Sequence, residues 1–469
     1  MQRSGYLMLA PLLVCTALAQ GGISTSAEFI RDREYHTLSS KDISQVPVPV
    51  DSNLVKASGI VPSVYDGLVA WADGRTGVVG IWGYELMNLP RDEFIVSDTT
   101  ATDGFQEGNP YVSAYGAIDS RDGIGALSSP VGPVVVYDGA QISGGVEPGN
   151  VFFANDSGVS PWNYYVATGQ PLTQRSPVCT NGMVAWVDDR NDAATPPFDR
   201  FTGIPNTDIY AQQVDPATGA TIGPEITIST SYAPQDRLAA DNGVLVWQEL
   251  RRSTVPFSGV SSWDIAGYAF GSGHFDVIDD TTSGPAKNQI DPDISGNLVV
   301  WTQEEDPSGT GATNIYIKSL LDPNSAPIPV TDTGTGARAA VSMGPDGHFV
   351  VWQDYRLDTT MITYLGGNTE SDYQWDIWGQ EVDANGTLIG DAFLINGDPG
   401  RQTNPDIYGL DVVWQTQGLV SPAVGSEDIY VIGPVPEPVT VVLLLVGAPL
   451  LLVRRRTAAR RARAAARRD

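Results

Sequence analysis

The chain has 469 residues, of which 42% are hydrophobic and 17% are charged, and its formal net charge is −28 at pH 7. A field of that sign repels phosphate backbones, so the composition excludes nucleic acid as a partner and favours cations and water instead. The length allows a large hydrophobic core, which a chain with only two cysteines needs, because it has almost no disulfide chemistry to stabilise it.

The pattern of residues 1–19 is typical of a secretory signal peptide. One positive charge at Arg3 precedes an apolar run, and the small residues Ala17 and Ala19 have the spacing that a signal peptidase prefers. Cys15 raises the alternative of a lipoprotein, but Val14 precedes it where lipid-attachment sites carry Gly or Ala. We therefore predict export, followed by a lead-in over residues 20–45, and expect the remaining Cys179 to be a buried thiol in a strand.

Six segments of the body repeat a short turn, an apolar run and a tryptophan. Asn-Gly and Asp-Gly turns beside β-branched runs predict tight hairpins. The copies are Asp66-Gly67 before Trp71, Asn181-Gly182 before Trp186, Asn242-Gly243 before Trp247, Gly296-Asn297 before Trp301, Asp346-Gly347 before Trp352 and Gly409 before Trp414, with a weaker seventh at Val134-Val135-Val136-Tyr137.

Each copy continues with a third strand and, in most copies, a fourth. The third strands carry an aromatic signature, as in Asp208-Ile209-Tyr210 and Asp376-Ile377-Trp378, and the fourth strands include Phe94-Ile95-Val96 and Phe393-Leu394-Ile395. The repeat predicts an all-β fold over residues 46–432, a single β-propeller of seven four-stranded blades. A six-bladed ring with an irregular insert is the alternative, because the second copy has tyrosine in place of tryptophan.

The last unit ends at Tyr430-Val431-Ile432 without a fourth strand of its own. Residues 46–51, Val-Pro-Val-Pro-Val-Asp, match the fourth-strand segment 326–331, Ala-Pro-Ile-Pro-Val-Thr. We therefore expect residues 46–51 to complete the last blade and close the ring, which would remove two open sheet edges. The pattern resembles bacterial and archaeal surface β-propellers of the TolB-like kind, with their VVW and DIY repeats. That resemblance implies the fold and leaves the function open.

Residues 433–469 form a tail of three parts: Pro436-Glu437-Pro438 within the motif 435–438, an uncharged segment over 439–453, and an arginine-rich end over 454–469. The apolar run, predicted as a C-terminal hydrophobic helix, is shorter than the ~20 residues of a usual membrane span. The arginines would stay cytoplasmic by the positive-inside rule. The tail resembles a PEP-CTERM sorting signal, which implies an exosortase-type enzyme of a Gram-negative-type bacterium as partner. An ordinary tail anchor is the alternative.

A second repeat, WxDxR, places a carboxylate and an arginine after several of the tryptophans. Examples are Asp188 with Arg190, Glu249 with Arg251 and Asp354 with Arg356. Because the pattern recurs from blade to blade, we interpret these pairs as braces within the blades rather than as catalytic acids and bases. The arginine is expected to bind its own carboxylate or the aspartate of the third strand.

No cofactor, metal site or catalytic residue is predicted. Asp291 to Gly296 begins like a calcium loop, but the twelfth position is Thr302 rather than glutamate, so we interpret the segment as a first blade strand. Weak Ca²⁺ binding by the acidic surface stays open. The three histidines, His36, His274 and His348, fall in different units, which argues against clustered histidine chemistry.

Two long loops between second and third strands carry aromatic residues among carboxylates. Such loops emerge on one rim of a propeller, and aromatics among acids are typical of carbohydrate-binding surfaces. The alternative is that these side chains pack the loops onto the blades. The candidate ligand-binding residues are Phe198, Phe201, Tyr355, Tyr364, Tyr373 and Trp375.

These features predict an exported protein at the cell envelope, cell surface or extracellular matrix, held transiently or permanently at the membrane by its tail. We expect it to act as a non-enzymatic binding or structural protein, with a polysaccharide or another envelope protein as partner. The alternative is a hydrolase or lyase that acts on extracellular polysaccharide with carboxylates near the central channel.

Overall fold

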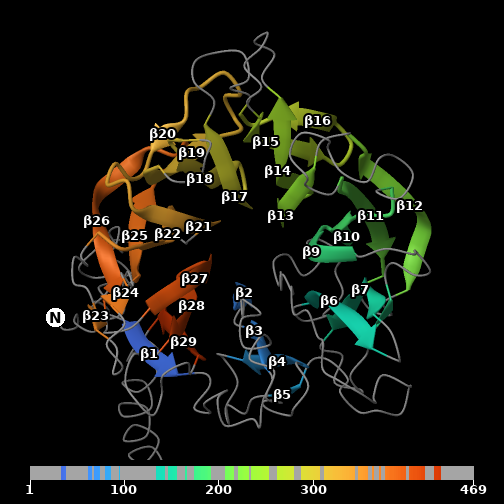
Figure 1. Cartoon of the computed structure of the whole chain (residues 1–469), viewed down its shortest axis with the longest axis horizontal. Helices are drawn as coiled ribbons and strands as arrows, with labels where there is room; N and C mark the ends of the chain where they lie inside the picture. The colour runs from blue at the N-terminus through green and yellow to red at the C-terminus, as the bar shows by residue number, and fades with distance from the viewer. Residues whose placement is uncertain are drawn as a thin grey trace, which may run out of the picture.

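The computed structural model describes residues 33–37, 62–65, 68–73, 80–85, 94–95, 134–142, 146–155, 164–165, 174–191, 206–215, 220–231, 234–252, 261–278, 287–306, 311–343, 347–356, 362–363, 369–370, 375–397, 401–417 and 427–434. Every regular element within these ranges is a β-strand, as the alternating and turn-rich sequence predicts. Figure 1 shows the sheets arranged around a common centre, the architecture of a β-propeller.

Six sheets in the described ranges have four antiparallel strands and one has three. The first two comprise β2 (Ser63–Tyr65), β3 (Leu68–Asp73), β4 (Gly80–Glu85) and β5 (Phe94–Ile95), then β6 (Val134–Ile142), β7 (Val146–Asn155) and β8 (Tyr164–Tyr165). The next two comprise β9 (Gln174–Thr180), β10 (Met183–Asp188), β11 (Asp208–Val214) and β12 (Thr221–Ser229), then β13 (Gln235–Asp241), β14 (Val244–Arg252), β15 (Ser261–Ala269) and β16 (Gly273–Asp276).

The chain continues with β17 (Asn288–Ser295), β18 (Leu298–Glu304), β19 (Thr313–Ser319) and β20 (Ile328–Pro329). The following sheet has β21 (Gly336–Met343), β22 (His348–Asp354), β25 (Asp376–Val382) and β26 (Leu388–Asn396), and the small hairpin β23 (Ile362–Thr363) and β24 (Thr369–Glu370) lies between β22 and β25 along the chain. The last sheet combines β27 (Arg401–Tyr408), β28 (Asp411–Gln417) and β29 (Glu427–Pro434) with β1 (Arg33–Thr37).

The outermost strand of the last sheet comes from near the N-terminus, but not from the predicted segment. β1 pairs antiparallel with β29, from Arg33 opposite Pro434 to Thr37 opposite Tyr430. β1 occupies the edge of β29 that residues 46–51 were expected to fill, and residues 46–51 themselves lie outside the described residues. A motif match is weak evidence at an outer strand, where backbone pairing dominates, and prolines at 47 and 49 remove two backbone donors that β1 retains.

The second sheet also differs from the prediction. Val134 to Tyr137 were expected to form its second strand, but they lie in β6, the first strand of the order β6-β7-β8. The second strand is β7, whose Phe152 and Phe153 lie opposite Tyr165 and Tyr164 of β8. The absence of a tryptophan from this copy hid β7 from the repeat pattern.

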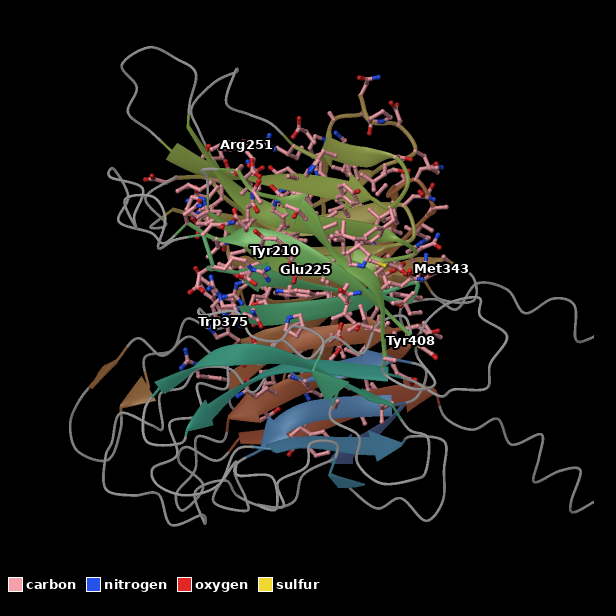
Figure 2. The ribbon with its side chains drawn as sticks, turned by 90° about the vertical axis from the view of Figure 1, so that its right-hand side faces the viewer. Tyr210, Glu225, Arg251, Met343, Trp375 and Tyr408 are labelled. Atoms are coloured by element: carbon pink, nitrogen blue, oxygen red, sulfur yellow. The ribbon has the colours of Figure 1, made fainter. Side chains whose placement is uncertain are left out.

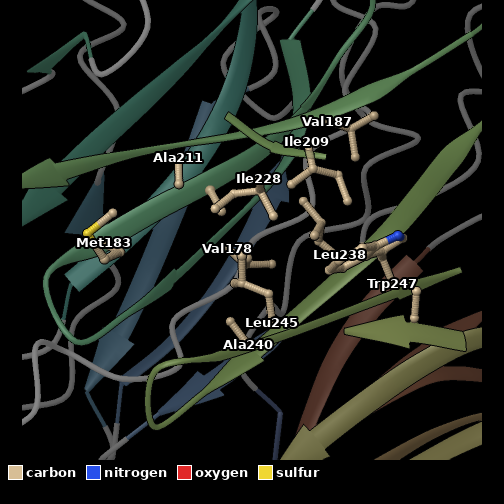
Figure 3. Close-up of a cluster of buried hydrophobic side chains, with 12 residues drawn as sticks. Val178, Met183, Val187, Ile209, Ala211, Ile228, Leu238, Ala240, Leu245 and Trp247 are labelled. Atoms are coloured by element: carbon tan, nitrogen blue, oxygen red, sulfur yellow. The ribbon is translucent and has the colours of Figure 1, made fainter. Parts of the chain in front are cut away.

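The predicted tryptophans form the core between successive sheets. Trp71, Trp186, Trp247, Trp301, Trp352 and Trp414 are each at most 1% exposed. Figure 3 shows one such layer, in which Ile209 and Ile228 of one sheet meet Leu245 and Trp247 of the next. Equivalent clusters join each later pair of sheets, and a further cluster packs Val413 of the last sheet against the first sheet.

A polar contact also repeats between neighbouring sheets. The last or second-to-last residue of an innermost strand accepts a hydrogen bond from a backbone N–H of the next sheet, at its hairpin turn or, for Met343, at the end of the strand before that turn. The four described cases are Gly243 to Thr180, Gly296 to Asp241, Met343 to Ser295 and Gly409 to Ser342. All of these residues except Met343 are buried or half-buried, and each contact fixes the register of one sheet on the next.

Candidate functional site

The propeller has two opposite rims, which Figure 2 shows in side view. Arg251 and Trp375 lie towards one side, where second strands end and third strands begin, and we call this side the loop rim. Met343 and Tyr408 lie towards the other side, which carries the tight hairpin turns, and we call it the turn rim. The WxDxR residues and the long connections belong to the loop rim.

The first described WxDxR pair joins Asp188 to Arg190. The Asp188 carboxylate is fully buried and accepts hydrogen bonds from Trp186 Nε1 at 3.1 Å and from the Arg190 backbone N–H at 2.8 Å. The Arg190 guanidinium binds Asp188 and Glu225 and lies 3.9 Å from the centre of the Tyr210 ring. Burial acts to lower the pKa of Arg190, but the hydrogen bonds and charges of the two carboxylates outweigh it, so the pKa is raised.

The pair Asp354 and Arg356 repeats this arrangement. Asp354 is fully buried and accepts from Trp352 Nε1 at 3.1 Å, from Thr335 Oγ1 at 2.5 Å and from Arg356 Nε at 2.8 Å. The guanidinium of Arg356 lies 4.4 Å from the centre of the Trp378 ring, within cation–π range. The aromatic residue of the third strand thus covers the arginine of the second.

A third case, Glu249 with Arg251, has longer contacts. Arg251 Nε donates to Glu249 Oε1 at 3.2 Å, and its Nη2 donates to Asp276 Oδ1 at 2.6 Å. The prediction of braces within the blade is confirmed, since each arginine binds the carboxylate two residues before it. Where a second carboxylate partner is described, Glu225 or Asp276, it lies on the fourth strand and not on the third as expected.

Buried acids face one another across the second and third strands. Asp188 is opposite Asp208, Asp354 is opposite Asp376, and Glu249 is opposite Asp264. Burial raises the pKa of Asp208, and the Asp188 charge adds to this, while a hydrogen bond from Asn191 opposes it. A carboxylate pair that cleaves a glycosidic bond must reach its substrate. The two aspartate pairs are at most 6% exposed, so their geometry fits bracing and not catalysis.

The segment that resembled a calcium loop is the innermost strand β17, as the alternative interpretation predicted. Asp293 is 4% exposed, and its carboxylate accepts the Val341 backbone N–H at 2.7 Å. The matching Asp406 accepts the Val64 N–H at 2.9 Å. Both acids therefore tie their sheet to the next one, and no group of three or more His, Cys, Asp or Glu side chains in the described ranges is placed to hold a metal ion.

Two of the six predicted rim aromatics lie in described residues, and the structure brings them together. The rings of Tyr355 and Trp375 are 4.9 Å apart in an edge-to-face arrangement at the two ends of the connection that contains β23 and β24. The Trp375 carbonyl accepts the Gln402 N–H of the next sheet at 2.8 Å. Phe198, Phe201, Tyr364 and Tyr373 lie outside the described residues.

The sequence analysis missed Tyr210 and Trp378 as functional partners of the arginines. Both occupy the aromatic position of the third-strand signature, directly across from Trp186 and Trp352. The signal that would have found them is the combination of the two repeats, since an arginine that follows a paired tryptophan lies near the aromatic residue of the neighbouring strand.

Comparisons with known proteins yield structures only. No protein-family model matches the chain, and no curated protein matches it. The β-propeller domain of the Trilobed protease from Pyrococcus furiosus is 10% identical, with a TM-score of 0.47, 80% of this chain covered and 97% of that chain. Oligogalacturonate lyase from Vibrio parahaemolyticus is 10% identical, with a TM-score of 0.46 and coverages of 86% and 97%.

A TolB from Agrobacterium tumefaciens is 15% identical, with a TM-score of 0.35, 64% of this chain covered and 85% of that chain. The chain spans about half the length of the peptidases that it also matches. Because all these TM-scores are below 0.5, the assignment of a β-propeller rests on the chain's own sheets.

The two predicted targeting segments, residues 1–19 and 433–469, lie outside the described residues except for Gly433 and Pro434 at the end of β29. The same is true of the sorting motif Pro436-Glu437-Pro438. Among the residues that the structure describes, no helix is long and apolar enough to cross a membrane.

Proposed function

We propose that this protein is an exported β-propeller of the cell envelope that binds a partner through its loop rim and catalyses no reaction. The observation that carries the proposal is the contact between Tyr355 and Trp375 at the two ends of the connection that contains the β23–β24 hairpin. Paired rings at the base of an insertion offer a rigid apolar platform, which suits the face of a sugar or an aromatic-rich protein segment.

The arrangement of the carboxylates favours binding over the rival enzymatic function. The described WxDxR acids already accept hydrogen bonds from their own arginines, and Asp188 and Asp354 also accept one from a tryptophan. A general acid or base needs a free path to the substrate proton. Release of product from acidic or neutral glycans by the purified protein would overturn the non-enzymatic proposal.

The binding proposal is tested on a glycan array and against envelope extracts with wild-type protein, Trp375→Ala and Tyr355→Ala. Loss of one aromatic contact worth about 1.4 kcal/mol weakens binding about tenfold. Met343→Ala and Leu321→Ala are matched controls, because these residues are 57% and 63% exposed; Met343 ends β21 and Leu321 follows β19, both at the turn rim. Equal loss of binding in these controls, or no loss in Trp375→Ala, would refute the role of the loop rim.

We further propose that the propeller has seven blades and that β1, paired with β29 in the last sheet, closes the ring. The support is the contact of the last sheet with the first, in which Asp406 binds Val64 and Ser63. If β6–β8 were an irregular insert in a six-bladed ring, deleting residues 128–170 would leave a folded protein. If they form a blade, the deletion opens the ring and abolishes cooperative unfolding, which circular dichroism would detect.

The remaining part of the proposal is the localisation of the protein. Residues 1–19 act as the signal peptide, and residues 433–469 act as a PEP-CTERM tail that an exosortase-type enzyme recognises. This assignment rests on the sequence of the two ends. Fractionation of cells that express the full chain or a Glu437→Ala variant tests it. We expect the full chain in the envelope or matrix, and retention of the variant in an unprocessed form; identical distribution would favour an ordinary tail anchor.

A further inference from the structure

Five innermost strands share an unusual backbone feature at one level. Each has one non-glycine residue with a left-handed φ, between 49° and 56°, which lies five positions before the hairpin turn in four strands and five positions before the last strand residue, Met343, in β21. Such a conformation is strained for an L-residue, and glycine would avoid the strain. All five positions carry polar side chains, which we call the bulge ring: Ser176, Arg237, Asp291, Arg338 and Asn404.

Three backbone N–H groups of the bulge ring donate hydrogen bonds to side chains of the preceding sheet. The N–H of Asp291 donates to Gln248 Oε1 at 3.0 Å, that of Arg338 to Thr302 Oγ1 at 2.9 Å, and that of Asn404 to Gln353 Oε1 at 2.9 Å. The acceptor is in each case the residue after the buried tryptophan. The repeat thus fixes these side chains at a common height on the inner strands.

The side chains of the bulge ring meet from one sheet to the next. Arg237 Nε lies 3.3 Å from Asp291 Oδ1, and Arg338 donates to the Asn404 side-chain carbonyl. Arg237 is 51% exposed although it lies in mid-strand. An innermost strand has a partner strand on only one edge, so an exposed side chain here faces the solvent at the centre of the sheets.

Arg338 differs from Arg237 in its charge balance. Its hydrogen-bond partner Asn404 is neutral, and within the described residues Arg338 forms no ion pair. A guanidinium has five N–H donors in a planar fork, which matches a carboxylate in two parallel hydrogen bonds. Arg338 is half-buried, so a carboxylate bound there is partly shielded from solvent.

The overall charge of −28 does not forbid this contact. At physiological ionic strength, charges more than about 8 Å away are largely screened. Within the bulge ring Asp291 is already paired with Arg237, which leaves Arg338 as the cation that, in the described part of the chain, faces no carboxylate partner. The overall charge instead disfavours long polyanions, which must approach the whole surface.

We propose that the bulge ring is a second binding site, distinct from the loop rim, which takes the carboxylate of a small ligand, with Arg338 as the bidentate anchor. Ligands with one or two carboxylates fit this site, and their neutral analogues do not.

The test is calorimetric titration of the full chain with succinate against succinamide and with glucuronate against glucose. We expect carboxylate binding that weakens as NaCl is raised, and at least tenfold weaker binding in Arg338→Gln. Arg338→Lys keeps the charge but loses the fork, so binding should fall between wild type and Arg338→Gln. Unchanged melting temperatures in both variants would show that the ring stays folded.

Lys287→Gln is the matched control. Lys287 is not a member of the bulge ring, and its Nζ lies 2.6 Å from Glu305 Oε2 in a half-exposed ion pair. The proposal is overturned if succinamide or glucose binds as tightly as its acid, if neither acid binds, or if Lys287→Gln weakens binding as much as Arg338→Gln. Retained carboxylate binding in Trp375→Ala separates this site from the loop rim.

Discussion

The brace at Asp354 gives the most direct test of how the blades are stabilised. Asp354→Asn keeps the shape of the side chain but removes its charge and places an N–H₂ group against the donors of Trp352 and Arg356. The wild-type carboxylate has no exposed surface and accepts bonds of 3.1 Å from Trp352 Nε1 and 2.8 Å from Arg356 Nε.

The size of the effect follows from these contacts. Removing one partner of a buried ion pair costs about 3–5 kcal/mol, and an unsatisfied buried donor costs about 1–3 kcal/mol. Arg356 is 20% exposed and can be partly hydrated after the change, so we expect the lower end, about 3 kcal/mol of unfolding free energy.

Urea unfolding followed by tryptophan fluorescence measures this loss. Asp322→Asn is the control, because Asp322 is exposed in a turn and its side chain accepts a local hydrogen bond from the Asn324 backbone N–H. The double variant Asp354→Asn with Arg356→Gln removes the uncompensated cation and should recover at least 1 kcal/mol. A loss below 1 kcal/mol in Asp354→Asn, or an equal loss in Asp322→Asn, would refute the structural role of the brace.

Three further outcomes follow from buried or paired groups. Burial lowers the pKa of His348 despite the nearby Asp383 charge, so the unfolded chain binds the imidazole proton more tightly than the folded chain. The contribution of His348 to stability should therefore be complete above pH ~6.5 and fall as the pH drops below it. His348→Phe should flatten this slope in pH-dependent urea melts. Although burial acts to raise it, the pKa of Glu305 is lowered by Lys287, so the pair's small contribution is present above the ordinary glutamate pKa and is lost on acidification, which Glu305→Gln should abolish in the same melts. Asp406→Asn should cost about 1–3 kcal/mol, because the Val64 N–H loses a charged acceptor, and hydrogen exchange of β2 should rise; unchanged exchange there would contradict a contact that joins the last sheet to the first.

Much of the fold was predictable because its signals are local. A turn and an apolar run that ends in tryptophan occupy about six consecutive residues, and Asn181-Gly182 and Asn242-Gly243 adopt the positive φ values that such turns require. The strand that pairs with β29 on its outer edge was not predictable from pattern, because β1 contributes backbone pairing there, and pairing of that kind constrains few side chains.

The brace was predictable for the same reason, since Asp188 and Arg190 are two residues apart on one strand end. The second carboxylate partner of Arg190, on the fourth strand, was not predictable. The pairing of β11 with β12 shifts register twice, between Ile209 and Tyr210 and between Ala211 and Gln213, so no fixed offset leads from the third strand to Glu225. The common height of the bulge-ring residues was not predictable either, because it depends on a bulge in each of those five innermost strands.

The position of β29 has a mechanical consequence. This strand lies between β28 and β1, so both of its edges are hydrogen-bonded up to Pro434 on the β1 side. A force applied to the chain beyond residue 434 therefore acts on a strand that is hydrogen-bonded along both edges. Separating β29 from the sheet requires the hydrogen bonds to β28 and those to β1 to break together. Single-molecule stretching of protein that lacks residues 33–37 would show the difference as a lower unfolding force.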